Sequence, residues 1–99
     1  MAKDIKAFMA WVRQHDRKRA LVLDAKSGPV GDALYVTMAQ GFHLQPYQLR
    51  LQTAQALWRV WADQHAKGDL DGVTMRFVDQ MGNIVGGTSI WSGAWVQKE

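Results

Sequence analysis

The feature that most constrains the fold of this chain is a long amphipathic segment that begins at Pro46 and ends at His65 or Ala66. Proline is favoured at the first position of a helix, because its fixed φ suits the helix and its missing N–H needs no partner there. Gly68 then provides a helix stop. Apolar residues recur between these limits at helical spacing: Tyr47, Leu51, Ala54, Leu57, Trp58, Val60 and Trp61. A helix with so wide an apolar face needs most of the remaining chain to cover it, so we predict a central helix over about 46–66.

The residues after this helix favour β-structure. Apolar and other residues alternate over 73–78, turn-forming residues occupy 79–83, and a second strand-like run covers 84–91. Ser92 and Gly93 supply another turn before residues 94–96. We therefore predict a C-terminal antiparallel hairpin or a three-stranded meander. The pair Gly86-Gly87 indicates a bulge, or a place where another backbone or a ligand comes close.

The pattern before the central helix leaves alternatives open. Apolar residues near the N-terminus recur at helical spacing and predict a helix opened by Asp4: Ile5, Phe8, Met9 and Val12. Residues 20–26 favour a further helical stretch, capped by Asp16, over a short strand. Residues 33–40 fit either a short capped helix or a strand, since Leu34, Val36 and Met38 alternate. A hairpin of 20–25 with 33–39, joined by residues 26–31, is the alternative.

These segments together predict one α+β domain that comprises residues 1–99. A chain of 99 residues has the size of a single domain, and 47% hydrophobic residues is a globular composition. The predicted domain has an N-terminal helical part, a central helix over about 46–66 and a C-terminal β-meander packed on it. If the hairpin of 20–25 with 33–39 forms, the order becomes αββαββ with a four-stranded antiparallel sheet.

Several kinds of chemistry are excluded or disfavoured by the residues present. The chain has no cysteine, which excludes disulfides, thiolate metal sites and a thiol nucleophile. The early apolar stretch 7–12 is too short for a signal-peptide core, and no apolar run approaches the ~20 residues that span a bilayer. We therefore expect a cytoplasmic protein with no membrane association.

No motif predicts a catalytic residue, a cofactor or a metal. The stretch 86–89 lacks the lysine and the following helix of a phosphate-binding loop. A calcium loop over 67–78 would place a lysine and a valine at ligand positions, which excludes it. His65, with Asp63, Asp69 and Asp71 near it in sequence, is the one cluster that fits acid–base chemistry. A surface histidine at a helix C-terminus explains it more simply, so we expect a protein that is not an enzyme.

Charge and tryptophan placement indicate where a partner binds. The net charge of +3 is the sum of +4 over residues 1–31, +1 over residues 32–68 and −2 over residues 69–99. The cations cluster at the end of the predicted N-terminal helix and just beyond it: Arg13, Arg17, Lys18 and Arg19. Trp91 and Trp95 lie four residues apart on a glycine-containing hairpin, and tryptophans that share an open sheet face are typical interface anchors. We predict that these six residues contact a partner.

The predicted function is that of a small non-enzymatic module that docks on a larger protein, as an inhibitor or adaptor. Phage and mobile-element anti-defence proteins have this size and lack of catalytic groups. The alternative is nucleic-acid binding, either through the basic N-terminal helix or through a helix-turn-helix-like segment over 33–66. A homodimer is compatible with both functions.

Overall fold

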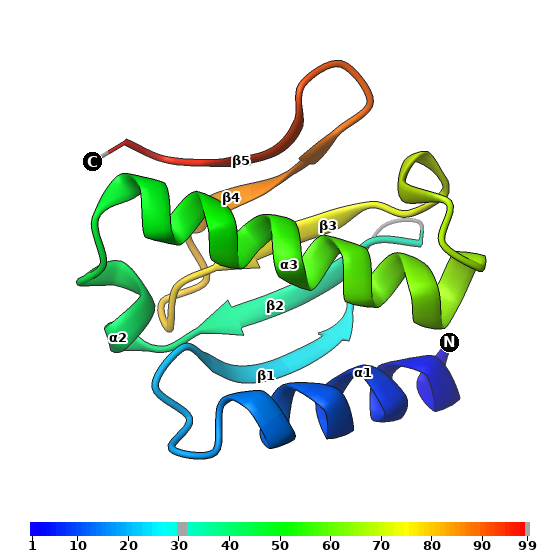
Figure 1. The fold of residues 1–99 in the computed structure, drawn as a ribbon, viewed down its shortest axis with the longest axis horizontal. Coiled ribbons are helices and arrows are strands. Elements are labelled where there is room, and N and C mark those ends of the chain that lie inside the picture. Colours follow the sequence, from blue (N-terminus) through cyan, green and yellow to red (C-terminus); the bar gives the residue numbers. More distant parts are fainter. Residues whose placement is uncertain (30–31, 99) are drawn as a thin grey trace.

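In the computed structural model, which describes residues 1–29 and 32–98, two long helices lie on one face of a five-stranded sheet (Figure 1). The elements are α1 (Ala2–His15), β1 (Val22–Ser27), β2 (Leu34–Met38), α2 (Gln40–His43), α3 (Tyr47–Ala66), the 3-10 turn η1 (Leu70–Gly72), β3 (Met75–Val78), β4 (Ile84–Ser89) and β5 (Gly93–Val96). The predicted α+β class and the central helix are confirmed. Val30 and Gly31, which belong to the predicted turn before β2, lie outside the described residues.

The strands follow one another across the sheet in chain order, from β1 to β5. β1 pairs with β2, β3 with β4 and β4 with β5, each antiparallel, so the C-terminal meander is confirmed. β2 and β3 are parallel. The alternative with four antiparallel strands was therefore wrong in strand number and in this central pair. The reason is α3: a helical crossover returns the chain to the end of the sheet where β2 began, which makes the next strand parallel.

The structure also corrects the preferred interpretation of residues 20–26, because strand β1 begins at Val22 and no further helical stretch forms. Helix α1 ends at His15. The Asp16 carboxylate then accepts the backbone N–H groups of Ala20, Leu21 and Val22, at 2.9 to 3.0 Å. These bonds turn the chain and leave Val22 positioned to enter the sheet.

Residues 34–38 form a strand because their alternating pattern suits a sheet that is covered on one face. Leu34, Val36 and Met38 are buried beneath the helices, whereas Tyr35 and Thr37 on the opposite face are half-buried. The hairpin predicted as the alternative is thus the structure that forms. Its register places Ala25 opposite Val36 and Ser27 opposite Leu34.

The core lies between the sheet and the two long helices. Helix α3 buries Ala54, Leu57, Trp61 and Ala62, and α1 buries Phe8 and Val12. The rings of Phe8 and Trp61 meet edge to face, with centroids 5.7 Å apart. Trp58 packs at the margin of this core and donates its indole N–H to the Leu70 carbonyl at 3.0 Å. The wide apolar stripe of α3 therefore packs the helical layer against the sheet.

The predicted close approach of another backbone at Gly86-Gly87 is confirmed, and the neighbours are strands of the sheet itself. The bulge in β4 falls on the adjacent residue Val85, because Phe77 pairs with Gly86 and Val78 with Ile84. The register of β3 with β4 shifts between Phe77 and Val78. A Cβ at Gly86 would lie 2.7 Å from the Trp95 carbonyl oxygen, and one at Gly87 would lie 2.9 Å from the Met75 carbonyl oxygen. Both positions therefore require glycine for β4 to fit between β3 and β5.

Candidate functional site

The predicted basic group divides into two arginines that donate to the backbone of β1 and two cations in the turn after α1. Arg13 and Arg19 both donate to the backbone carbonyl of Leu23, at 2.8 and 3.0 Å. Arg17 and Lys18 are exposed in the turn after α1, and the structure shows no hydrogen bond from either side chain to the described residues. We call these two residues the basic turn. Arg17, Lys18 and Arg19 are all exposed, whereas Arg13 is half-buried.

Both predicted DNA-binding arrangements need correction in their structural premises. The basic residues after position 15 do not extend the N-terminal helix, because α1 ends at His15. The segment 33–66 is not two helices joined by a turn, since residues 34–38 form β2 and α2 has only four residues. Helix α3 directs Leu57 and Trp61 into the core, so one side of it is covered by the sheet.

The two C-terminal tryptophans lie in different environments. Trp91 is in the turn between β4 and β5 and is 90% exposed, next to Ile90 at 72%. Trp95 is half-buried on β5, directly opposite Gly87 of β4. The tryptophans therefore do not share a sheet face. We call Ile90 and Trp91 the apolar tip.

Figure 1 places the apolar tip and the basic turn far apart. The turn between β4 and β5 is at the upper right, whereas the turn after α1 is at the lower left. The molecule measures 31 × 31 × 23 Å, so these two groups lie near opposite corners of its broad face. The structure does not bring the six predicted contact residues together into one surface.

The apolar tip is held in a fixed position by contacts at its base. The Ser89 hydroxyl oxygen accepts the backbone N–H of Trp91 at 3.1 Å. Gly93 has a φ of 73° and packs on the Trp58 ring, where a Cβ would lie 3.3 Å from ring carbon Cζ3. The turn is therefore anchored to α3 through Trp58, while the side chains of the tip remain in solvent.

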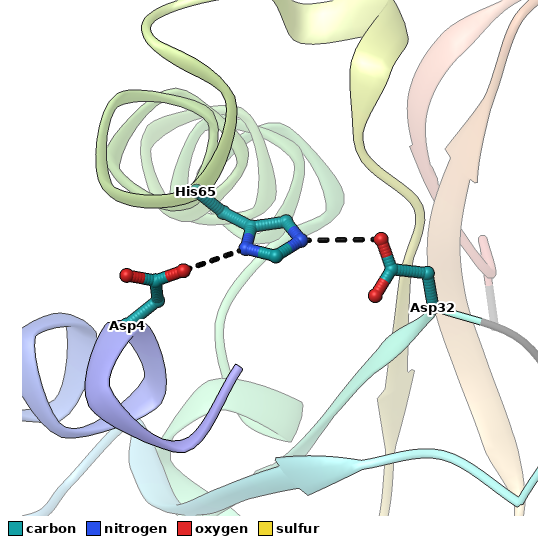
Figure 2. A network of polar contacts seen from close by, with 3 residues as sticks. All are labelled: Asp4, Asp32 and His65. Carbon is teal, nitrogen blue, oxygen red and sulfur yellow. Dashed lines mark hydrogen bonds and ion pairs between the residues drawn. The ribbon is translucent and has the colours of Figure 1, made fainter.

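His65 joins three separate parts of the chain (Figure 2). Its Nδ1 lies 2.8 Å from the Asp4 carboxylate of α1, and its Nε2 lies 3.1 Å from the Asp32 carboxylate just before β2. The imidazole also stacks on Trp61, with centroids 4.7 Å apart and the planes 8° from parallel. The predicted neighbours Asp63, Asp69 and Asp71 do not take part in this network.

The two carboxylates determine the protonation state of this network. The hydrogen bond to Asp4, followed by that to Asp32, raises the pKa of His65 above its usual 6.5. In turn the hydrogen bond to His65 lowers the pKa of Asp4. Each ring nitrogen faces an acceptor, so the favoured form of His65 carries protons on both.

The partners of His65 were missed by the sequence reasoning because they are 61 and 33 positions away in the chain. No local spacing signals such a contact. In the described part of the chain, no group of three or more His, Asp or Glu side chains could hold a metal ion. None of the helices described there is long and apolar enough to cross a membrane.

An open cavity of about 430 Å³ lies beside the start of α3. Arg50 lines it and bridges two segments, because Nε donates to the Gln45 carbonyl and Nη1 to the Gln97 carbonyl. Tyr47 and Lys98 line the same cavity, with the Lys98 Nζ 5.9 Å from the Tyr47 ring centroid. These contacts fix the end of β5 against the start of α3.

Comparison with known proteins gives no match: no family model, no curated protein and no solved structure matches the chain. What the molecule binds is therefore inferred from its own geometry and charge.

Proposed function

We propose that this protein is a non-enzymatic binding module that docks on a larger protein partner through the apolar tip, Ile90 and Trp91. The observation that carries the proposal is the exposure of two adjacent large apolar side chains, at 72% and 90%. A tryptophan buries a large area when it enters a pocket, and tryptophans are enriched among the residues that dominate binding energy. Scattered surface apolar residues need no explanation, but a paired and anchored tip supports an interface.

The rigidity of the tip supports the same function. A side chain that is already positioned loses less conformational entropy on binding than one on a mobile loop. Here the bond from Trp91 N–H to Ser89 and the packing of Gly93 on Trp58 position the turn before any partner arrives. The tip is thus preorganised to insert into a partner's pocket.

The chemistry around the tip defines the partner surface. Asp71 lines the same small depression as Ile90, at the junction of η1 with β4. The matching partner surface is therefore an apolar pocket with a basic or neutral rim. A module of this kind works by occupying the partner's surface, as inhibitors, adaptors and anti-defence proteins of phages or mobile elements do.

The test compares Trp91→Ala with Met81→Ala in affinity capture from the host's lysate. Met81 is the matched control because it is 86% exposed and lies in the turn between β3 and β4. We expect one defined protein to be retained by the wild type and by Met81→Ala. Trp91→Ala should bind that protein at least about 30-fold more weakly, the loss typical of a truncated hot-spot residue.

Two results would refute the docking proposal. One is a partner that Trp91→Ala retains as well as the wild type does. The other is tight binding to duplex or single-stranded nucleic acid in a gel-shift series, with log affinity falling by several units per log unit of salt. If replacement of Arg17 and Lys18 by alanine abolishes this nucleic-acid binding, the basic turn is the binding site and the function is nucleic-acid binding.

A further inference from the structure

Strand β5 forms one edge of the sheet, and some of its backbone N–H and C=O groups point away from β4 into solvent. β5 pairs with β4 alone. The Gln97 N–H donates to the Val85 carbonyl at 2.9 Å, which fixes the phase of the antiparallel ladder. Because bonding alternates along such a ladder, Gly93 and Trp95 also direct their N–H and C=O groups toward β4. Ala94 and Val96 direct theirs outward.

The opposite edge of the sheet is protected along its strand, whereas at β5 a cation meets the backbone only beyond the strand, where Arg50 donates to the Gln97 and Lys98 carbonyls. At β1, Arg13 and Arg19 donate to the Leu23 carbonyl, and the register shifts between Val22 and Asp24. Bulges and edge cations are the usual means of preventing an edge strand from pairing with another chain. Residues 93–97 contain no charge, no proline and no bulge. An edge of this composition is suited to accept a further strand.

We propose that β5 pairs antiparallel with β5 of a second copy of this chain, about a twofold axis at Trp95, to form a continuous sheet across a homodimer. With the axis at Trp95, Ala94 faces Val96 of the second copy and Val96 faces its Ala94. Every outward N–H and C=O of these two residues then has a partner. If the axis moves to Ala94 or to Val96, that residue pairs with the same residue of the second copy. The other outward residue then falls opposite a residue outside β5.

The side chains fit this register. Trp95 occupies a position that is not hydrogen-bonded in the new ladder, where opposing Cα atoms are about 4.5 Å apart and side chains are closest. Its side chain lies on the sheet face away from the helices, since its neighbours Ala94 and Val96 are buried beneath them. The two tryptophans therefore meet as a cross-strand aromatic pair, which is stabilising.

Charge is also compatible with a second copy of the chain. The paired segments 93–97 are uncharged, and Lys98 falls opposite Ser92 of the second copy, so no like charges meet across the axis. Arg50 holds the Gln97 carbonyl, so the end of β5 is fixed before pairing. The interface is centred on β5 rather than on the apolar tip, so this inference does not depend on the proposed function.

A cysteine cross-link provides the first test, because the natural chain has no cysteine. Trp95→Cys places two thiols across the proposed axis at a separation that a disulfide can span. Met81→Cys is the control, since it is exposed on the turn between β3 and β4. In a glutathione redox buffer we expect Trp95→Cys to form a covalent dimer at least about tenfold faster than Met81→Cys. Equal rates would overturn the proposal.

A charge-pair experiment provides a second test that does not rely on a disulfide. Four-residue strands bury a small interface, so we expect a wild-type dissociation constant on the order of 100 μM by sedimentation velocity. Trp95→Lys and Trp95→Glu should each be monomeric, and their equimolar mixture should recover the dimer. A wild-type monomer at about 1 mM, or no recovery in the mixture, would overturn the twofold pairing. So would an edge that binds an unrelated extended peptide without self-association.

Discussion

The carboxylate of Asp16 is predicted to be one of the most important polar groups for stability, because it accepts hydrogen bonds from the backbone N–H groups of three successive residues. Its Oδ1 accepts the N–H of Ala20 at 3.0 Å, and its Oδ2 accepts those of Leu21 and Val22 at 2.9 Å each. Replacement by alanine removes all three bonds where the chain turns from α1 into β1. The free energy of unfolding should fall accordingly.

The expected loss follows from the environment of each bond. Hydrogen bonds to a charged group contribute about 1.5 kcal/mol or more, and solvent exposure reduces this value. The bond to Ala20 is exposed and is assigned about 0.5 kcal/mol, whereas the two part-buried bonds are assigned about 1.2 kcal/mol each. Asp16→Ala should therefore lose about 3 kcal/mol. For a domain of this size that corresponds to a Tm lowered by about 15 °C.

Urea denaturation of three variants would test this reasoning. Asp24→Ala is the matched control, because Asp24 is exposed and the described residues include no hydrogen-bond partner for its side chain. We expect it to lie within about 0.5 kcal/mol of the wild type. Asp16→Asn keeps one acceptor oxygen and should be intermediate. If Asp16→Ala is as stable as the Asp24 control, the three bonds do not stabilise the turn.

Three further predictions concern the core, the sheet and the histidine network. The pKa of His65 is raised in the folded state, so the stabilisation that protonated His65 provides is complete below its unfolded pKa of about 6.5 and is lost as the pH rises through the folded pKa. The free energy of unfolding, measured from about pH 5 to 9, should therefore decline more steeply in the wild type than in His65→Gln. Gly86→Ala should lose about 2 kcal/mol or more in urea denaturation, because its Cβ would lie 2.7 Å from the Trp95 carbonyl oxygen. Phe8→Ala, at a fully buried position, should lose about 3–4 kcal/mol in the same assay.

Each of these has a result that would contradict it. A flat pH profile, identical in the wild type and in His65→Gln, would mean that the bonds to Asp4 and Asp32 do not stabilise the folded state. A Gly86→Ala variant as stable as the exposed-turn variant Ser92→Ala would show that the sheet adjusts to the extra carbon without cost. A Phe8→Ala loss below about 1 kcal/mol would place α1 outside the cooperative core.

The sequence predicted α3 well because its apolar stripe is long enough for the helical period to be distinguished from the period of a strand. The same reasoning failed over residues 20–26 and left 33–40 undecided, since seven or eight residues satisfy either period. In the structure the outcome depends on contacts that the local pattern does not signal: Leu34 lies opposite Met75 in the parallel pair, and the Asp16 carboxylate holds the N–H groups that lead into β1. The parallel pair itself follows from the long crossover helix and was derivable in principle, once the hairpin was accepted.

The candidate site was less predictable than the fold. Trp91 and Trp95 look equivalent in sequence, and only the register of β4 with β5 places one in the turn and the other in the strand. Arg13 and Arg19 look like surface cations, but both donate to the Leu23 carbonyl. A positive charge in a sequence does not reveal whether its side chain meets solvent or a carbonyl.

The parallel pairing of β2 with β3 has a consequence for how the chain folds. Each antiparallel pair joins strands that are close in sequence, whereas Leu34 and Met75 are about forty residues apart. Closing so long a loop costs entropy before its contacts form, so this step is expected to limit the folding rate. A chain cut between Lys67 and Gly68 would leave β2 in one fragment and β3 in the other, each without its parallel neighbour. The antiparallel pairs within each half are therefore expected to form before the β2–β3 pair. The stability of each half nevertheless depends on the other.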